Sequence, residues 1–481
     1  MYRTLFAGLG CLVLLWACSE IDDSYSTNPN HRLGFSVDTL SFDTVFTTIG
    51  SATRQFMVYN THAEPLNIEA VRLNQGSSGF RLNVDGRSGE SFSNIRILGK
   101  DSLYVFVEVT VDPTGVNSPL LMEDRLDFTV NGRTQSVCLQ AYGQDVHLYK
   151  GGYALKRDTL WTAERPYLIY DSLVVDSGIT LTLEKGASLY MHAQAKWVIN
   201  GTLKAAGTLD APITFRGDRL DNLLTDLPYD RIANQWDGIY FGTGSFENLM
   251  DFVVVRNGNH GLQFLESAPE QPKIRISNSQ ITNMGEVVLN AVNCRIESVN
   301  TEFSNARGNI LSLSGGNYHF IHCTLVNYYL LNPGRQGEPV LSLQTEKALK
   351  TVFDNCIIDG SFSEGDKPFK GELSIDDSKA EALSIRFNHC ALKTMQLEDT
   401  AFVKTSFIHK DYPLRYKLLG KAETNAFDFR LDSCEAAVGK ADPAIAARYP
   451  LDRWGIDRTT SSDGPDIGAY EYVPEPEKED E

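Results

Sequence analysis

The feature that most constrains the fold is a six-residue phrase that returns six times between residues 250 and 392. Its copies read MDFVVV, ISNSQI, SVNTEF, FIHCTL, FDNCII and FNHCAL, and their first and sixth places are mostly large and apolar. The fourth place is small or sulfur-bearing and holds Val253, Ser279, Thr301, Cys323, Cys356 and Cys390. Apolar places on both sides of a polar place, with alternation resuming after it, predict two strand segments that meet at a bend.

The third place of the phrase is mostly Asn or His. It holds Phe252, Asn278, Asn300, His322, Asn355 and His389. Asn tolerates the left-handed backbone that such a bend needs, so we expect these residues to form a ladder of turns. Successive third places are 26, 22, 22, 33 and 34 residues apart by subtraction, a spacing that indicates a solenoid with its length variation in loops. A parallel β-helix satisfies these conditions, because stacked coils bury the apolar columns in one continuous core.

The repeat resembles the right-handed parallel β-helix proteins, a family that includes pectate lyases, other polysaccharide-active enzymes and many bacterial surface proteins. The phrases NGTL at residues 200–203 and APITF at 211–215 are similar to the first coils of bacterial members, and DIGAYEY at 466–472 resembles their C-terminal ending. The resemblance implies a β-helix over residues 151–430 and a cap over 431–473 that covers the open end of the last coil. It does not imply an activity, because one scaffold hosts unrelated functions.

The N-terminal residues have the pattern of a targeting signal rather than of a folded domain. Residues 1–17 combine an early positive charge with an apolar run too short to span a membrane comfortably. The sequence LWAC ending at Cys18 resembles the lipobox of bacterial lipoproteins, which implies cleavage before Cys18 and its lipidation. The acidic residues at 20–23 resemble the surface-export signal of Bacteroidetes lipoproteins. We therefore expect a tether over residues 18–32 and an outer-membrane, cell-surface location.

Residues 33–150 contain about seven alternating strand-like runs separated by turn signals such as DPTG at 112–115 and NG at 131–132. This pattern predicts an antiparallel, immunoglobulin-like sandwich. We expect a spacer or interaction module with Cys138 as a small buried residue. The fold class predicted for the whole chain is thus all-β, with an immunoglobulin-like sandwich followed by a right-handed parallel β-helix.

The cysteine pattern favours reduced thiols over disulfides. Cys323, Cys356 and Cys390 share one column, and neighbours in a parallel stack point the same way, which is poor geometry for a disulfide. The adjacent pair His322 and Cys323 does not predict a metal site, because neighbouring residues on a strand face opposite sides.

Composition and motifs point to binding. The formal net charge of −18 argues against nucleic acid as a partner, since binding to its phosphates is favoured by Lys and Arg. The expected partners are the membrane, through the lipid anchor, and a polysaccharide or a surface protein. We find no catalytic set in the motifs, and the pair at residues 376–377 has no matching acidic column. The alternative is a polysaccharide lyase or glycoside hydrolase acting on a uronate-containing glycan, with catalytic residues unknown and calcium as its cofactor.

Two segments are candidates for ligand contact. Tyr328 and Tyr329, with Arg335 in the following loop, would form a sugar-stacking platform. The insertion at residues 216–235 would be either a lid over the coils or a ligand site. The acidic tail at residues 474–481 is predicted to be disordered.

Overall fold

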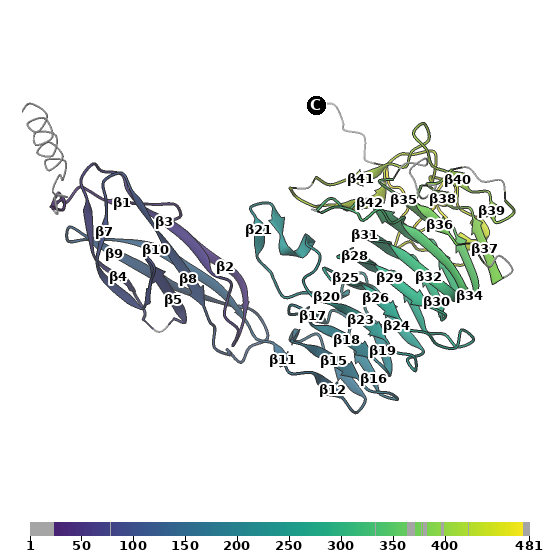
Figure 1. The fold of residues 1–481 in the computed structure, drawn as a ribbon, viewed down its shortest axis with the longest axis horizontal. Helices are drawn as coiled ribbons and strands as arrows, with labels where there is room; N and C mark the ends of the chain where they lie inside the picture. Colours follow the sequence, from purple (N-terminus) through teal and green to yellow (C-terminus); the bar gives the residue numbers. More distant parts are fainter. Residues whose placement is uncertain are drawn as a thin grey trace, which may run out of the picture. The chain divides into compact units, whose positions relative to one another are not determined.

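A computed structural model describes residues 24–474 apart from 77, 332, 363–370, 377, 379–381, 396–398 and 422. It divides into two compact units, Met1–Asp145 and Val146–Glu481. The described residues are nearly all β (Figure 1), with only two short helices among them, η1 (Tyr229–Arg231) and α2 (Pro443–Ala446). None of the helices in these ranges is long and apolar enough to cross a membrane. The predicted lipidation site Cys18, most of the tether's first residues and the acidic tail from residue 475 lie outside the described residues.

The first unit consists of two five-stranded sheets around one hydrophobic core. One sheet has the order β1 (Leu33–Phe35), β3 (Arg54–Asn60), β8 (Ser102–Val109), β5 (Phe80–Val84) and β6 (Arg87–Gly89). The other has the order β2 (Thr39–Phe46), β10 (Arg133–Gln144), β9 (Leu120–Val130), β4 (Leu66–Leu73) and β7 (Ser91–Ile97). Pairing is antiparallel except between β2 and β10, which run parallel and depart from the all-antiparallel expectation.

Two long parallel sheets build the second unit, and the shorter of them has eleven strands. Its order is β11 (His147–Tyr149), β14 (Tyr167–Ile169), β17 (Ser188–Met191), β20 (Ile213–Gly217), β25 (Val253–Arg256), β28 (Gln280–Met284), β31 (Glu302–Ala306), β33 (Thr324–Asn327), β35 (Ile357–Gly360), β38 (Ala391–Leu392) and β40 (Ser406–Phe407). Because β11 pairs with β14, residues 147–149 belong to this unit, although the sequence placed them with the first.

The second sheet has seventeen strands. They are β12 (Tyr153–Leu155), β13 (Thr159–Trp161), β15 (Ser172–Val175), β16 (Thr180–Leu183), β18 (Lys196–Ile199), β19 (Thr202–Ala206), β23 (Gly238–Phe241), β24 (Asn248–Asp251), β26 (Leu262–Phe264), β27 (Ile274–Ser277), β29 (Leu289–Val292), β30 (Arg295–Val299), β32 (Leu311–Ile321), β34 (Leu341–Asp354), β36 (Leu373–Ile375), β37 (Leu383–Asn388) and β39 (Phe402–Val403). Two columns of strands merge in this sheet, because the long strands β32 and β34 belong to both columns. Most coils therefore contribute two strands here and one to the eleven-stranded sheet.

The predicted bend is confirmed at every copy of the repeat. All six third places have left-handed backbone, with φ between 48° and 55°. Each separates the two sheets: β24 ends at Asp251 and β25 begins at Val253, with Phe252 between them. Stacking of their side chains is confirmed in part, because Asn300 donates to Asn278 at 3.2 Å, whereas Phe252 has no polar group to offer.

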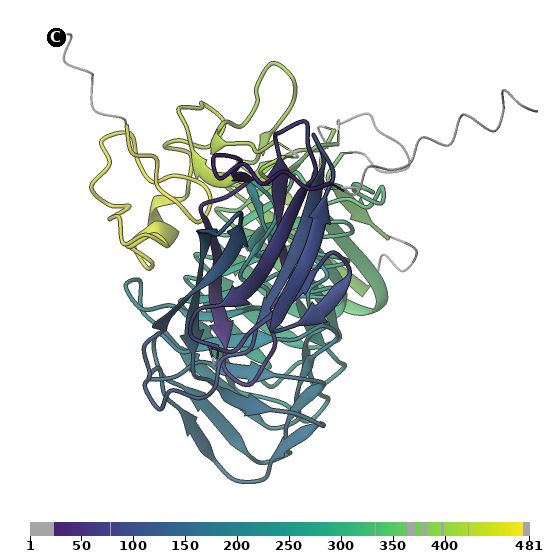
Figure 2. The same ribbon diagram turned by 90° about the vertical axis from the view of Figure 1, so that its left-hand side faces the viewer.

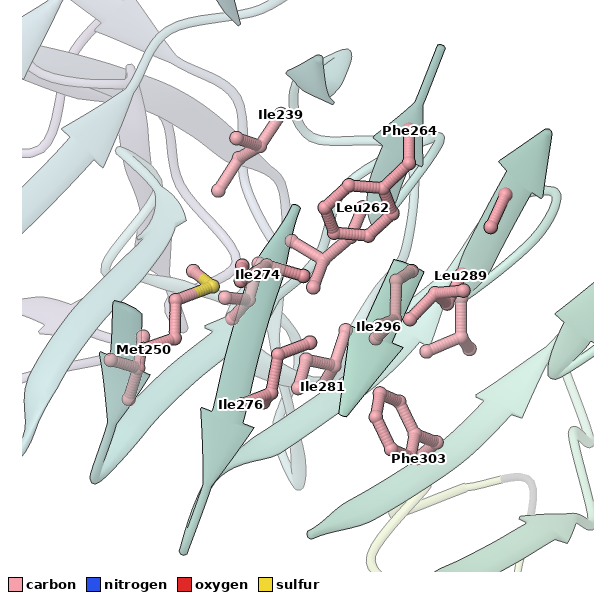
Figure 3. Packing of buried hydrophobic residues seen from close by; sticks show 14 of the residues in the cluster. Ile239, Met250, Leu262, Phe264, Ile274, Ile276, Ile281, Leu289, Ile296 and Phe303 are labelled. Atoms are coloured by element: carbon pink, nitrogen blue, oxygen red, sulfur yellow. The ribbon is translucent and has the colours of Figure 1, made fainter. Parts of the chain in front are cut away.

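The apolar columns of the repeat lie in register inside the coils. Their first places pair in the order Met250, Ile276, Ser298, Phe320, Phe353 and Phe387. The rings of Phe320, Phe353, Phe387 and Phe402 form one stack, with centroids 5.1–5.2 Å apart and planes within 9° of parallel. Figure 3 shows neighbouring core residues, such as Met250, Ile276 and Phe303, converging on the same interior. Burial of such columns is the main source of the stability of stacked coils.

The cysteines of the repeat form the expected reduced ladder. All six described cysteines are free, and Cys323, Cys356 and Cys390 are fully buried. The backbone N–H of Cys323 donates to Cys356 Sγ at 3.4 Å, so the column is tied across coils without a disulfide. Cys138 is half-exposed rather than buried, because it alternates with the inward-facing Val137 and Leu139 on β10.

The C-terminal segment, residues 436–472, lies along the side of the coils instead of covering the last one (Figure 2). The N–H of Gly468 donates to the carbonyl of Asn355 at 2.8 Å, and the N–H of Ala469 donates to Thr324 Oγ1 at 2.9 Å. DIGAYEY is therefore bound to the turns of middle coils, where left-handed residues leave backbone groups that need partners.

Replacing His322 with Asn should make the second unit less sensitive to acid. His322 is fully buried, and burial, reinforced by the charge of Arg458, lowers its pKa well below 6.5. The unfolded chain therefore binds a proton below pH 6.5 that the folded chain does not, so His322 contributes stability above that pH which is lost as the pH falls. Between pH 7 and 5.5 the native chain should lose about 1 kcal/mol more than the variant.

Urea unfolding at each pH measures this difference. Asn occupies the same column at residues 278, 300 and 355, so the variant keeps a residue suited to positive φ. Exposed His409 changed to Asn is the control. Equal pH dependence of the native chain and the His322 variant would contradict the prediction.

Candidate functional site

The outer face of the eleven-stranded sheet changes character along the stack. Alternate residues of each strand point away from the core, and on β25, β28 and β31 they are mostly polar: Val254, Arg256, Gln280, Thr282, Glu302 and Ser304. On the next strands the outward residues include Val326, Ile357 and Ala391, which are apolar and buried in a separate cluster with residues of the C-terminal part of the chain. A functional site is therefore expected on the polar coils, next to this covered part.

A pocket of about 310 Å³ lies at this point. We call it the sheet-face pocket; it is lined by Asp230, Arg231, Arg256, Gln280, Thr282, Asn283, Glu302, Ser304, Asn305, Asn425, Ala426, Phe427 and Phe429. The sheet forms its floor. The insertion at residues 216–235, which contains the hairpin β21 (Asn222–Leu224) and β22 (Leu227–Pro228), forms one wall. The hairpin β41 (Tyr416–Leu418) and β42 (Asp428–Leu431) forms the other, and both hairpins project from the same side of the coils (Figure 1).

A shared ion pair defines the basic side of the sheet-face pocket. Asp230 Oδ1 lies 2.9 Å from Arg216 Nη1 and 3.0 Å from Arg256 Nε, so one carboxylate serves two guanidinium groups. Burial lowers the pKa of Arg256, while Asp230 acts in the opposite direction. The cluster retains one net positive charge in a strongly acidic chain, and Arg256 lines the pocket.

The acidic side is Glu302, which is only 3% exposed. Its carboxylate accepts hydrogen bonds from Tyr470 at 2.5 Å, Ser304 at 2.6 Å and Gln280 at 2.9 Å. Among the described residues it forms no ion pair. Three neutral donors hold this carboxylate in a fixed orientation at the floor of the pocket.

Two nearly buried amides belong to the lining of the pocket. Asn283 and Asn425 are 8% and 2% exposed, and neither side-chain oxygen has a hydrogen-bond partner in the described part of the chain. Such oxygens are unusual, because buried polar atoms nearly always find a partner. Opposite them, Phe427 and Phe429 stack with ring centroids 5.5 Å apart. The pocket thus combines unpaired acceptors, a guanidinium donor and an aromatic surface.

The three residues predicted to form a stacking platform are held in contacts within the protein. Tyr329 is buried, and the Arg335 side chain is 4% exposed in a two-point ion pair with Glu372, both distances being 2.8 Å. Tyr328 is half-buried and donates to Asp359 at 2.7 Å. An open platform needs accessible rings, so these residues are held for packing, and their role in binding stays a prediction. Asp377, of the acidic pair at 376–377, lies outside the described residues.

The sequence signalled only one wall of the sheet-face pocket, the long insertion. Gln280 and Glu302 occupy the fifth place of the repeated phrase, where polar residues give way to Ile357 and Ala391 in later copies. That change was a usable signal for the polar coils. Nothing in the local sequence of Asn425 and Phe427 signals a site, because they reach the pocket only through the path of a C-terminal hairpin.

Comparisons with known proteins do not assign the chain to a family. No family model matches it. A stretch of 164 residues is 27% identical to Protein bark beetle of Drosophila melanogaster and covers 33% of this chain and 5% of that protein, so the chain spans a small fraction of this relative. A protein of unknown function from Porphyromonas gingivalis matches with 15% identity and a TM-score of 0.18 over 26% of this chain and 60% of that chain. The PapD-like domain 7 of human CEP192 matches with 10% identity and a TM-score of 0.17 over 27% of this chain and 96% of that chain.

Proposed function

We propose that this chain is a cell-envelope lipoprotein whose second unit binds carbohydrate in the sheet-face pocket without cleaving it. The observation that carries the binding function is the set of unpaired amide oxygens, Asn283 and Asn425, beside the Arg256 guanidinium and the ring of Phe427. Sugars present hydroxyl donors and acceptors around an apolar ring face. A concave site with a few fixed polar groups and an aromatic surface suits such a ligand.

The proposal includes the finer fold assignment. The second unit is a right-handed parallel β-helix, supported by coils of up to three strands and by columns in register across the repeat. The first unit is an immunoglobulin-like sandwich, supported by its two sheets around one core. In this arrangement the first unit spaces the binding unit from the lipid anchor.

Binding without catalysis is favoured by the state of the two carboxylates in the pocket. Asp230 is paired with two arginines, and Glu302 accepts three hydrogen bonds from neutral donors. A general acid or base needs to exchange a proton with the substrate, whereas these two carboxylates are engaged in ion pairs and hydrogen bonds within the protein. The alternative is a polysaccharide lyase or glycoside hydrolase, and product analysis distinguishes the two.

Replacing Asn283 with Gly should weaken saccharide binding about fivefold to tenfold, because it removes a buried amide that would bond the ligand. Gly keeps the positive φ of 58° at this position. The full-length chain is titrated calorimetrically against a panel of neutral and acidic oligosaccharides, with mass spectrometry of the products.

The matched control is Asn293→Gly, a second Asn with positive φ that lies between the other sheet's strands β29 and β30 and donates to Glu266. Equal binding by both variants would place the ligand elsewhere. Defined cleavage products would overturn the non-catalytic part of the proposal.

Replacing Cys18 with Ala should release the protein from the membrane fraction, because anchoring by acyl chains requires the lipidated Cys. Fractionation of cells expressing each form measures the effect. A change of Cys138 to Ala is the matched control. Retention of the Cys18 variant in membranes would remove the lipoprotein assignment, while the carbohydrate site would remain open to the titration above.

A further inference from the structure

We infer that the sheet-face pocket takes a short saccharide or the terminal sugars of a chain, and excludes the interior of an extended polysaccharide. This inference rests on the proposed carbohydrate binding and adds the class of ligand. It follows from how the walls of the pocket block the two directions in which a polymer could cross the sheet.

The insertion closes the pocket toward the first coils. It leaves the sheet after Gly217 and returns at Trp236, and Asp230 within it is held by Arg216 of β20 and Arg256 of β25. Asn257 secures the same segment, because its side-chain amide donates to the carbonyl of Asp230 at 2.6 Å and also reaches two neighbouring carbonyls. The outer face of β20 is therefore covered by protein at this level.

The C-terminal hairpin closes the pocket toward the last coils. Tyr416 of β41 donates to Asp359 on the outer face of β35 at 2.9 Å, and Tyr328 donates to the same oxygen at 2.7 Å. Phe429 of β42 packs against both tyrosines, with ring centroids 5.4 Å and 6.2 Å away. A chain running across successive strands would meet these rings directly after β31.

The two walls also touch each other. Arg231 Nη1 donates to the carbonyl of Thr424 at 3.0 Å, and the Asn425 amide donates to the carbonyl of Arg231 at 2.5 Å. This contact, which we call the bridge, joins segments almost two hundred residues apart along one flank of the pocket. Tyr470 donates a hydrogen bond to Glu302 of the floor. Protein therefore bounds the floor toward the first coils, toward the last coils and along the flank of the bridge.

The open floor is short. Its strands are β25, β28 and β31, and neighbouring strands lie about 4.8 Å apart, so the distance from the first to the third is roughly 10 Å. The volume of about 310 Å³ is at the lower end of the range for ligand pockets. This space suits a monosaccharide or disaccharide.

The test is the dependence of affinity on ligand length. Cello-oligosaccharides and oligogalacturonates of one to six units are titrated into the full-length chain. In the native protein the affinity should rise to two units and then stay within about twofold up to six. In the variant Arg231→Ala the contact of Arg231 with Thr424 in the bridge is lost, and six units should bind about tenfold more tightly than two.

Arg219→Ala is the matched control, because Arg219 lies in the same insertion, pairs with Asp221 and does not line the pocket. It should keep the native length dependence. Affinity of the native chain that keeps rising beyond three units would overturn this inference and leave carbohydrate binding intact. Absence of binding to every member of both series would overturn the proposed function and this inference with it.

Discussion

Replacing Arg458 with Ala is expected to lower the free energy of unfolding of the second unit by about 3–5 kcal/mol, because a buried carboxylate is left without its partner. The Arg458 side chain is fully buried and forms an ion pair with Glu471, itself nearly buried. The same guanidinium donates to Asn300 at 3.2 Å and to the carbonyl of Gly468 at 3.1 Å. One residue therefore ties the C-terminal segment to the turn ladder.

The loss should depend on pH. Burial raises the pKa of Glu471 to about 7, above its usual 4.5, even with Arg458 in place. A group whose pKa rises on folding contributes stability at low pH that is lost as the pH rises through the folded value. Without Arg458 this pKa rises further, so the variant should be more strongly destabilised at pH 8.5 than at pH 6.

Urea unfolding followed by tryptophan fluorescence measures the effect, because Trp161, Trp197, Trp236 and Trp454 all lie in the second unit and residues 33–145 contain no Trp. The control is Arg448→Ala, an exposed Arg of the same segment, which should change stability by no more than about 0.5 kcal/mol. Equal effects of the two variants would mean that Arg458 does not hold the segment.

Replacing Trp197 with Ala should also cost about 3–5 kcal/mol, here through loss of core packing. Trp197 is fully buried, with its ring edge-on to Trp161 at 5.6 Å and to Phe215 at 5.1 Å. Its indole N–H has no hydrogen-bond partner among the described residues. Phe in its place would remove an unpaired buried donor, whose burial costs about 1–3 kcal/mol. We therefore expect Trp197→Phe to be at least about 2 kcal/mol more stable than Trp197→Ala.

The same urea unfolding compares both variants, with Trp454→Ala as the control for loss of an exposed Trp. Circular dichroism is the second probe, since each variant lacks one fluorophore. Equal destabilisation by Phe and Ala at residue 197 would contradict the prediction. It would mean that the smaller cavity and the loss of the unpaired N–H do not make the Phe variant more stable.

The coil geometry was predictable because it depends on a few neighbouring residues and because their pattern repeats along the chain. Asn278, Asn300 and Asn355 each predict a left-handed bend from their own chemistry, and each has one. The column Cys323, Cys356 and Cys390 was predictable as an inward, reduced ladder for the same reason, since strand alternation sets direction. Cys138 was not, because a single cysteine in an alternating run does not show which face is inward.

The path of the C-terminal segment was not predictable from its motif. DIGAYEY was expected across the last coil, yet Gly468 and Ala469 bond to coils that precede it. The surroundings of Arg335, one of the residues expected in a stacking platform, were not predictable for a related reason. Arg335 pairs with Glu372, which is distant in sequence. A buried carboxylate is costly without a cationic partner, and only the fold shows which cation lies beside it.

The sequence by itself determined the coils: where the chain bends, which side chains point inward and which columns stack, because these depend on backbone preference and strand alternation within a few residues. Only the tertiary structure decided the site. Arg256, Glu302 and Asn425 come from separate parts of the chain, and they share a pocket because the outer face turns apolar after β31 and the C-terminal segment covers it from there. Burial of that apolar face positions the hairpin that completes the pocket, and no local pattern encodes such a long-range contact.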